Sequence, residues 1–299
     1  MVTPATRREA VSWIRGRFGL SERRACALAA AARTTVRYCS GQAERDATLR
    51  RTLEDLAAAR PRFGYRRLHT LVARSGQAVN RKRVYRVYRD AGLAVQRKKR
   101  KRVAQANRQP RVAATDRNQQ WSMDFMGDTL ASGRSFRVLN VVDDASRECP
   151  ASEVDLSLPG ARVTRVLDRL VAERGKPQRI VVDNGPEFTS RALDQWAYDN
   201  GVELVFIRPG KPVENCFVES FNGKMRDECL NAHWFATLAE ARRLIEHWRL
   251  DYNHVRPHSS LGGLPPAQFR GEAGLRPSTT TSAPPPHPQD TESDRPGVS

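Results

Sequence analysis

The hydrophobic pattern of this chain changes its period near residue 118. Before that point apolar residues recur only at helical spacing, and after it short apolar runs typical of β-strands alternate with helical segments. Strands that alternate with helices predict a mixed α/β sheet with helices on both faces. The 299 residues are therefore expected to form a helical region followed by an α/β domain.

Positive charge is concentrated in one segment. The whole chain carries 51 Lys and Arg against 33 Asp and Glu, a formal charge of +18. Residues 60–111 hold 18 of these basic residues and a single acid, whereas residues 112–299 hold 22 basic and 26 acidic residues. Such a localised cationic segment predicts nucleic acid as a partner. A solvated basic tail that only aids solubility is the alternative interpretation.

Residues 1–96 predict two groups of helices with helix-turn-helix spacing. Helices are expected over residues 7–18 and 22–31, with Ser21 as the N-cap of the second, and near residues 34–38. The chain is helical again from residue 49, and residues 60–96 repeat the two-helix design. We expect one domain over residues 1–59 and a DNA-binding segment over residues 60–96. Small helical domains without DNA-binding function show the same spacings. The basic residues expected to contact DNA on the last helix are Arg81, Lys82, Arg83 and Arg86.

A linker is expected over residues 97–117, where apolar periodicity is lost. It begins with six consecutive cations, which repel one another and stay extended unless phosphate groups neutralise them. We expect all six to contact DNA: Arg97, Lys98, Lys99, Arg100, Lys101 and Arg102.

The α/β domain is expected over residues 118–271. Three consecutive antiparallel strands are predicted at residues 121–126, 135–144 and 152–158, and two further strands at 179–185 and 202–209. Helices are predicted at residues 160–174, 190–200, 213–230 and 238–252. Residues 272–299 are rich in Pro, Ser and Thr and are expected to be disordered, because too few apolar residues offset the entropy of ordering.

The sequence carries no sign of a membrane or secretory protein. It has no run of about 18 apolar residues and no apolar core of a signal peptide, so an intracellular location is expected. Five cysteines without a CxxC pair are expected to be reduced thiols. Cys229 and His233 are four residues apart, and this lone pair is expected to be structural rather than a metal site.

Three acidic residues stand where a carboxylate is costly or well placed for chemistry. Asp124 lies in the middle of the first strand, and Asp183 ends an apolar strand at the edge where ligands collect in α/β sheets. Glu219 lies on a helix whose apolar and polar residues alternate. Singly, Asp183 could cap a turn and Glu219 could be solvated. Together the three provide the oxygen ligands that Mg²⁺ prefers.

Other acids compete for these roles. Asp143 and Asp144 follow a strand and are expected to be turn residues, since a position inside a strand aims a side chain more firmly. Glu187 lies in a Gly/Pro loop and is expected to contact substrate. Glu214 is near a helix start, where acids favour the helix dipole.

Neighbours of Glu219 on its helix are candidates for further roles. Asn222 at i+3 and Arg226 at i+7 share its face and are expected to meet DNA. Lys224 is roughly 140° from that face and is a weaker candidate, while Asn215 at i−4 is expected to support the site. A closing turn is expected either to pack the domain or to contact DNA, through Tyr252, Asn253, Arg256 and His258.

Three segments of the α/β domain resemble the catalytic motifs of DDE transposases and retroviral integrases. They are WSMDFM, VVDNGPEF and PVENCFVESFNGKMRDECLN, with 35 residues between Asp183 and Glu219. The segments GYRRLHTLVARSGQAVNRKRVYRVYRDAGL and DYNHVRPHSSLGGLPPAQF resemble the helix-turn-helix and closing blocks of the second-frame transposase in the bacterial insertion-sequence-three family. The resemblance covers about residues 10–270 and implies a ribonuclease-H-like core, a mixed five-stranded sheet with flanking helices, behind a helix-turn-helix region.

The resemblance also implies a reaction. Asp124, Asp183 and Glu219 would be the catalytic residues and would hold two Mg²⁺ (or Mn²⁺) ions for DNA cleavage at the element's ends and strand transfer into a target. Two alternatives are a catalytically inactive DNA-binding regulator and a nuclease of the same fold.

Partners and location are implied in the same way. The partners would be element-end and target DNA, further copies of the chain on that DNA, and a first-frame helix-turn-helix protein as fusion or separate subunit, because the chain starts as second-frame proteins do. The location would be the bacterial cytoplasm, associated with the nucleoid. Retroviral integrases carry an N-terminal His/Cys zinc module whose ligand spacing is missing here, so recognition of DNA ends is expected to fall to the basic helical front.

Replacing the six residues 97–102 with Gln should weaken DNA binding and flatten its salt dependence. Each phosphate contact that is lost removes about 0.9 from the slope of log K against log salt concentration. Fluorescence anisotropy with duplex DNA at several salt concentrations measures this slope. An unchanged slope would show that the run takes no part in binding.

Overall fold

The computed structural model describes residues 3–38, 41–95, 114–208 and 215–269. The chain divides into two compact units, residues 1–108 and 109–299. The six cations of the expected linker and all of the expected tail lie outside the described residues. None of the described helices has the length and apolar character needed to cross a membrane, and none of the described cysteines is in a disulfide.

The first helical group has a small core. Helices α1 (Pro4–Phe18), α2 (Glu22–Leu28) and α3 (Arg33–Arg37) pack around Val11, Ala25 and Cys26. The Ser21 side chain accepts a hydrogen bond from the backbone N–H of Arg24, which confirms its predicted role as an N-cap. Helix α2 ends three residues before the predicted end, because Ala30 takes a left-handed backbone conformation with φ of 46°.

The second helical group is larger and consists of α4 (Gln42–Ala59), α5 (Tyr65–Arg74) and α6 (Arg81–Asp90). All three helices contribute to one core. The domain boundary expected at residue 59 therefore divides this core, and the correct grouping begins with α4, seven residues before the helix start expected at 49. The buried residues of this core are Leu49, Leu53, Phe63, Leu68, Val72, Val84, Val87 and Tyr88.

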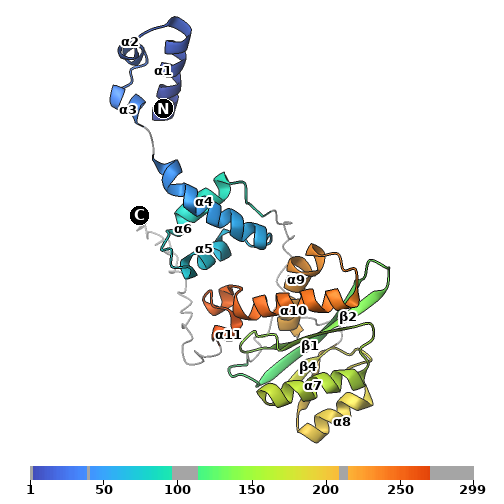
Figure 1. The fold of residues 1–299 in the computed structure, drawn as a ribbon. Helices are drawn as coiled ribbons and strands as arrows, with labels where there is room; N and C mark the ends of the chain where they lie inside the picture. Colours follow the sequence, from blue (N-terminus) through green and yellow to red (C-terminus); the bar gives the residue numbers. More distant parts are fainter. Residues whose placement is uncertain (1–2, 39–40, 96–113, 209–214, 270–299) are drawn as a thin grey trace, which may run out of the picture. The chain divides into compact units, whose positions relative to one another are not determined.

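The second unit contains the predicted five-stranded sheet (Figure 1). Its strands are β1 (Gln120–Thr129), β2 (Ser135–Asp143), β3 (Ala151–Asp155), β4 (Arg179–Val182) and β5 (Glu203–Phe206), in the spatial order β3-β2-β1-β4-β5. Strand β2 is antiparallel to both β1 and β3, whereas β4 runs parallel to both β1 and β5. The prediction of a mixed sheet is confirmed.

Helices cover both faces of the sheet (Figure 1). One face packs Trp121 and Met123 of β1 against α7 (Gly160–Arg174) and α8 (Arg191–Asn200). The other face packs Met126 and the apolar side chains of β2 against α9 (Cys216–Glu228) and α10 (Leu238–His254). Short helical turns at Leu230–Ala232, Ser259–Leu261 and α11 (Pro266–Phe269) complete this side. Because side chains alternate along a strand, β1 separates two cores and belongs to both.

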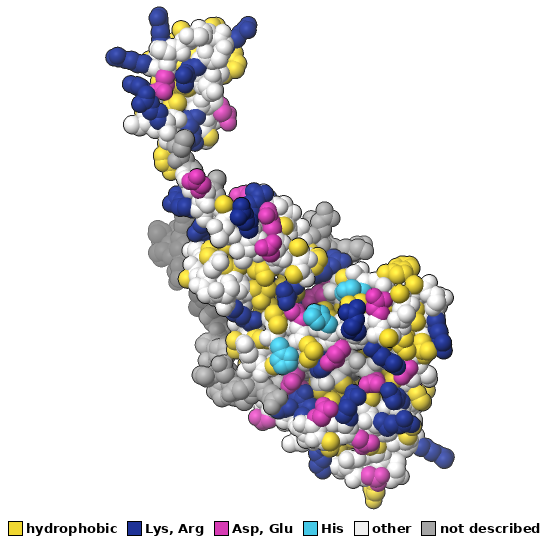
Figure 2. All heavy atoms as spheres, viewed as in Figure 1, with side chains coloured by type: hydrophobic (Ala, Val, Ile, Leu, Met, Phe, Trp, Pro, Cys, Tyr) yellow, Lys and Arg dark blue, Asp and Glu magenta, His cyan; other side chains and the backbone are white. Residues whose placement is uncertain are grey.

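Strand β3 forms one edge of the sheet and is surrounded by paired charges. Its Glu153 carboxylate bonds to Arg162 (2.9 Å) and Arg169 (3.0 Å) of α7. Arg242 of α10 bonds to Asp155 (3.0 Å) and also donates to the backbone C=O of Val154 (2.9 Å) on the same strand. Figure 2 shows the corresponding mixture of acidic and basic side chains over this unit.

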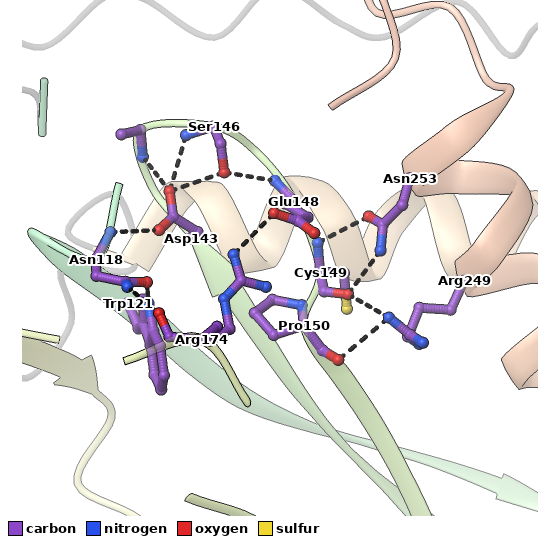
Figure 3. A network of polar contacts seen from close by, with 11 residues as sticks. Asn118, Trp121, Asp143, Ser146, Glu148, Cys149, Pro150, Arg174, Arg249 and Asn253 are labelled. Carbon is purple, nitrogen blue, oxygen red and sulfur yellow. Dashed lines mark hydrogen bonds and ion pairs between the residues drawn. The ribbon is translucent and has the colours of Figure 1, made fainter. Parts of the chain in front are cut away.

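A polar network fixes the chain between β2 and β3 (Figure 3). The Asp143 carboxylate is fully buried and accepts hydrogen bonds from the backbone N–H groups of Asn118 and Ser146, both at 2.8 Å. Its predicted role as a turn residue is confirmed. Asn253 of α10 accepts from the backbone N–H of Cys149 (2.9 Å) and donates to its C=O (2.8 Å). Helix α10 is thereby tied to the start of β3.

The closing block packs the domain. Tyr252 and Asn253 lie in α10 rather than in the predicted turn, because the helix continues to His254. Arg256 makes two hydrogen bonds with Glu228 of α9 (2.6 and 2.7 Å), and only 2% of its side chain is exposed. The ring of His258 lies edge-on to that of Tyr252, with 4.6 Å between centroids. Of the two expected roles for this block, packing is the one that these contacts support.

Candidate active site

One face of β1 carries a row of polar side chains beneath α9. Gln120, Ser122 and Asp124 point to this face, while Trp121 and Met123 between them point to the opposite core. A polar row inside a sheet needs hydrogen-bond partners within the protein, because water has little access to it. The structure supplies these partners from β2 and α9.

Asp144 accepts hydrogen bonds from the first two residues of this polar row. Its carboxylate accepts hydrogen bonds from the side-chain amide of Gln120 and from the hydroxyl of Ser122 (2.6 Å), and only 1% of the residue is exposed. The sequence predicted a turn residue here. The structure adds an anchor for β1 to that role and leaves Asp124 as the acid further along the same strand face.

Asp124 is held by two N–H donors. Its Oδ1 accepts from the backbone N–H of Phe125 and its Oδ2 from the side-chain amide of Asn222 on α9, both at 2.8 Å. Asn222 is 8% exposed. The sequence placed Asn222 on the face of Glu219 and predicted a DNA contact. In the structure this side chain is used inside the domain, where it orients Asp124.

Asn140 continues the chain of amides. It lies opposite Asp124 in the β1–β2 register, is fully buried, and donates from Nδ2 to Oδ1 of Asn222 at 2.8 Å. This residue was not among the candidates predicted from the sequence. The available signal was an amide in the otherwise apolar run of residues 138–142, on the strand next to the one that carries Asp124.

Asp124 lies within electrostatic reach of the other two predicted carboxylates. Burial raises the pKa of Asp124 to about 6, and repulsion from Asp183 and Glu219 adds to the increase. Burial also raises the pKa of Glu219. Asp183 directly follows β4, the parallel neighbour of β1, and its Oδ1 accepts from the backbone N–H of Gly185 (2.9 Å). A Cβ atom at Gly185 would lie 2.9 Å from that oxygen, so a larger residue here would displace the Asp183 carboxylate.

These acids are neighbours without forming a closed ligand cage. Among the described residues, no three Asp, Glu, His or Cys side chains lie close enough to hold one metal ion together. Mutual repulsion disfavours a closer approach of ionised carboxylates. Carboxylate oxygens are nevertheless the ligands that hard divalent cations prefer. The site therefore has suitable donors in one region of the sheet.

The loop after Asp183 is anchored to the sheet. Glu187 forms an ion pair with Arg137 of β2, and this contact lowers the pKa of Glu187. The Arg137 guanidinium lies 4.2 Å from the ring centroid of Phe125, which in turn stacks on Phe188 at 4.9 Å. Glu187 is thus used in a structural ion pair, and its expected substrate contact stays a prediction. Glu214, the other competing acid, lies outside the described residues.

Three further polar residues on α9 have contacts within the domain. Asn215 is buried and donates to the backbone C=O of Met123 (3.1 Å), next to Asp124, in agreement with its expected supporting role. Arg226 donates to the C=O of Gly127 (2.6 Å) and pairs with Asp128 at the end of β1. The Lys224 ammonium lies 3.1 Å from the hydroxyl of Ser220.

The His233 ring contacts the backbone C=O of Cys229 (2.8 Å), a structural contact as predicted.

The basic residues of α6 fall into two groups. Arg83 and Arg86 both bond to the carboxylate of Asp46 on α4, at 2.7 and 2.6 Å, and therefore hold α6 against α4. Arg81 and Lys82 are exposed, as predicted for DNA contacts. A pocket of about 500 Å³ opens around the ion pairs and is lined by Gln42, Arg45, Asp46, Lys82, Arg83 and Arg86.

The outer face of α6 presents a stripe of three side chains, of which only Arg81 was among the DNA contacts expected from the sequence. Arg81, Tyr85 and Arg89 are exposed and four residues apart, so they line up along the helix. Tyr85 is held by its contact with Tyr65, whose ring centroid is 4.7 Å away.

Comparisons with known proteins agree with both parts of the chain. Residues 114–212 match the integrase core domain family, residues 200–266 match a second integrase core domain family, and residues 44–101 match the HTH-like domain family. The last match includes α4, in agreement with the shared core of α4, α5 and α6.

Close relatives come from insertion elements. A 31.7 kDa protein of insertion element IS407 from Burkholderia multivorans is 49% identical over 259 residues, which are 87% of this chain and 94% of the relative. A 39.2 kDa protein of IS476 from Xanthomonas euvesicatoria is 45% identical over 90% of this chain and 78% of the relative. The transposase InsD of IS2 from Escherichia coli is 28% identical over 70% and 73%.

The mixed sheet with its helices is thus an integrase-type, ribonuclease-H-like core, which follows a helix-turn-helix-like unit in the sequence. The chain belongs to the DDE transposases of insertion sequences. It is a transposase, an enzyme that cleaves and transfers DNA strands, and DNA is its partner.

The substitution Asp124→Asn should stabilise the metal-free protein at high pH. An unfolded Asp titrates near pH 3.9, so raising the pKa to about 6 in the folded state destabilises the fold increasingly as pH rises between these values. The amides of Asn140 and Asn222 can rotate to keep the hydrogen bonds. Calorimetry in a chelator should show a Tm higher by about 3–6 °C at pH 8 and no gain at pH 4. An equal gain at both pH values would contradict the assigned cause.

Proposed function

We propose that Asp124, Asp183 and Glu219 are the catalytic residues and hold two Mg²⁺ ions, or Mn²⁺ in their place. The observation that carries this proposal is the placement of the three acids: Asp124 is partly buried in β1 and held by two N–H donors, Asp183 follows the parallel neighbour β4, and Glu219 lies on α9 above the same strand. Repulsion from Asp183 and Glu219 contributes to the raised pKa of Asp124. Bound ions would activate the attacking oxygen and stabilise the leaving oxygen of an in-line displacement. The donors present are of the type that such ions require.

The chain's own contribution is to orient these ligands. Phe125 and Asn222 each donate one N–H group to the Asp124 carboxylate, and Gly185 donates one to Asp183. Each carboxylate oxygen keeps a lone pair for a cation, since an oxygen accepts more than one contact. In the cleavage step water would attack a phosphodiester and free a 3′-OH at the element's end. In the joining step this 3′-OH would attack the target strand.

We further propose how the transposase reaches its DNA. Residues 97–102 and the outer face of α6 would bind the element's ends. Asn222 would orient Asp124 instead of contacting DNA, and Arg226 would contact DNA beside the three acids. The supporting observation is the charge of residues 1–111, which hold 29 basic and 7 acidic residues. The enzyme would act as a homo-oligomer on DNA in the bacterial cytoplasm, at the nucleoid. A first-frame helix-turn-helix protein would join it, fused or as a separate subunit.

The substitution Asp183→Asn should abolish joining and leave DNA binding close to that of the wild type. Loss of groups that merely support a metal ligand costs about 10–100-fold, so loss of a ligand should reduce joining by more than about 100-fold. A strand-transfer assay with element-end DNA and Mg²⁺ or Mn²⁺ measures joining, and gel shifts measure binding.

The same assay separates the three candidate functions. Joining by the wild-type protein supports the transposase mechanism, cutting without joining indicates a nuclease, and binding alone indicates an inactive regulator. Retained joining by Asp183→Asn would rule out this residue as a ligand.

Substitutions on α6 should distinguish residues that contact DNA bases from residues that hold the helix in place. Arg81→Ala or Arg89→Ala should change the preference among DNA sequences, by about 1–3 kcal/mol at the base pairs that they contact. Arg86→Ala should instead lower the Tm and weaken all sequences equally, because its partner Asp46 loses an ion pair. Competition binding with a randomised end sequence distinguishes these outcomes. A uniform loss for Arg81→Ala and Arg89→Ala would show that the outer face contacts only phosphates.

A further inference from the structure

Asn140 lies at the buried end of a chain of three side chains from three elements. Its Nδ2 donates to Oδ1 of Asn222 on α9, and Nδ2 of Asn222 donates to Oδ2 of Asp124 on β1, with 2.8 Å in each contact. Asn140 itself is on β2 and is fully buried. No part of the mechanism described above requires it to touch a metal ion or DNA.

We propose that Asn140 is a positioning residue, which fixes the amide of Asn222 and through it the Asp124 carboxylate in the orientation that metal binding needs. The inference rests on the proposed function of Asp124 as a metal ligand. It adds a residue outside the three acids whose effect on metal binding is indirect.

Hydrogen-bond polarity gives the chain one consistent arrangement. An ionised carboxylate only accepts, so Asn222 has to turn its NH₂ group toward Asp124. The oxygen of Asn222 then points away from the acid and needs a donor, and Asn140 provides it. Without that donor the Asn222 amide could rotate by 180°, which would place its oxygen against the carboxylate.

The amide of Asn140 is maintained at a cost to stability. Its Oδ1 is buried and has no hydrogen-bond partner among the described residues. An unsatisfied buried acceptor destabilises a fold. The neighbours on the same strand face, Val138 and Val142, are fully or almost fully buried in the apolar core against α9 and α10. A valine at position 140 would therefore suit the surroundings better, and packing alone does not account for the amide.

The register of the sheet fixes the two ends of this chain of three side chains. Asn140 is the direct partner of Asp124 in the antiparallel β1–β2 ladder, so strand pairing fixes the two backbones against each other. Asn222 follows Glu219 by three residues on α9, so the helix that carries Asn222 also carries a second proposed ligand. The contact from Asn140 thus sets the position of that helix face relative to Asp124.

The test is the variant Asn140→Val in the full-length protein, with Mn²⁺ alone as the probe. Calorimetric titration should show Mn²⁺ binding weaker by about 10–100-fold, and joining should require a correspondingly higher Mg²⁺ concentration. The Tm in a chelator should change little, because the variant removes the unsatisfied oxygen of Asn140 but leaves the oxygen of Asn222 without its donor. A purely structural role predicts the opposite pattern, a lower Tm with unchanged Mn²⁺ affinity.

Asn253→Ala is the matched control. Asn253 is another buried amide of the same unit, but it holds the backbone of Cys149 (Figure 3) and not an acid of the site. This variant should lower the Tm and keep Mn²⁺ affinity within about twofold of the wild type. The double variant Asn140→Val/Asn222→Ala should bind Mn²⁺ no more weakly than Asn222→Ala, because both residues act through one contact.

Two results would overturn the proposal in different ways. Wild-type affinity for Mn²⁺ in Asn140→Val would remove Asn140 from the site while leaving the three acids as ligands. Failure of the wild-type protein itself to bind Mn²⁺ would overturn the metal site, and the positioning role with it.

Discussion

The partly buried carboxylate of Asp124 in the central strand is the constraint around which the α/β unit is arranged. An acid at this position has lost most of its water, and the raised pKa records that loss. The protein replaces the water with N–H donors from the strand itself and from α9. This is why one face of an otherwise apolar sheet carries a polar row, and why the helix that covers it carries amides among its apolar residues.

The surroundings of a charged side chain also explain why arginines have different roles in this chain. A cation with a buried acid as its partner stabilises the fold, as Arg256 does with Glu228 and Arg83 with Asp46. Arg81, by contrast, is exposed on a regular helical face, the position expected of a cation that contacts DNA. Net charge alone cannot make this distinction, because it depends on what lies opposite each side chain in space.

The sequence was sufficient to predict the architecture, and it also singled out the acids of the proposed site. Alternating apolar runs predicted all five strands, and the position of Asp124 inside such a run singled it out. The boundary at residue 59 was misplaced, since the tertiary packing of α4 against α5 and α6 leaves no local mark in the chain. Asn140 was missed for a related reason. Its importance comes from strand register and from a helix 82 residues further along, and neither can be read from neighbouring residues.

The arginine side chains around β3 have a consequence for how copies of the enzyme can assemble. An edge strand normally offers its backbone groups to a strand of another molecule. Here Arg242 binds the C=O of Val154, and Arg249 binds the C=O groups of Cys149 and Pro150 just before the strand. These carbonyls are already occupied, which disfavours lengthening the sheet through this edge. A second copy of the enzyme is therefore not expected to add a strand at β3.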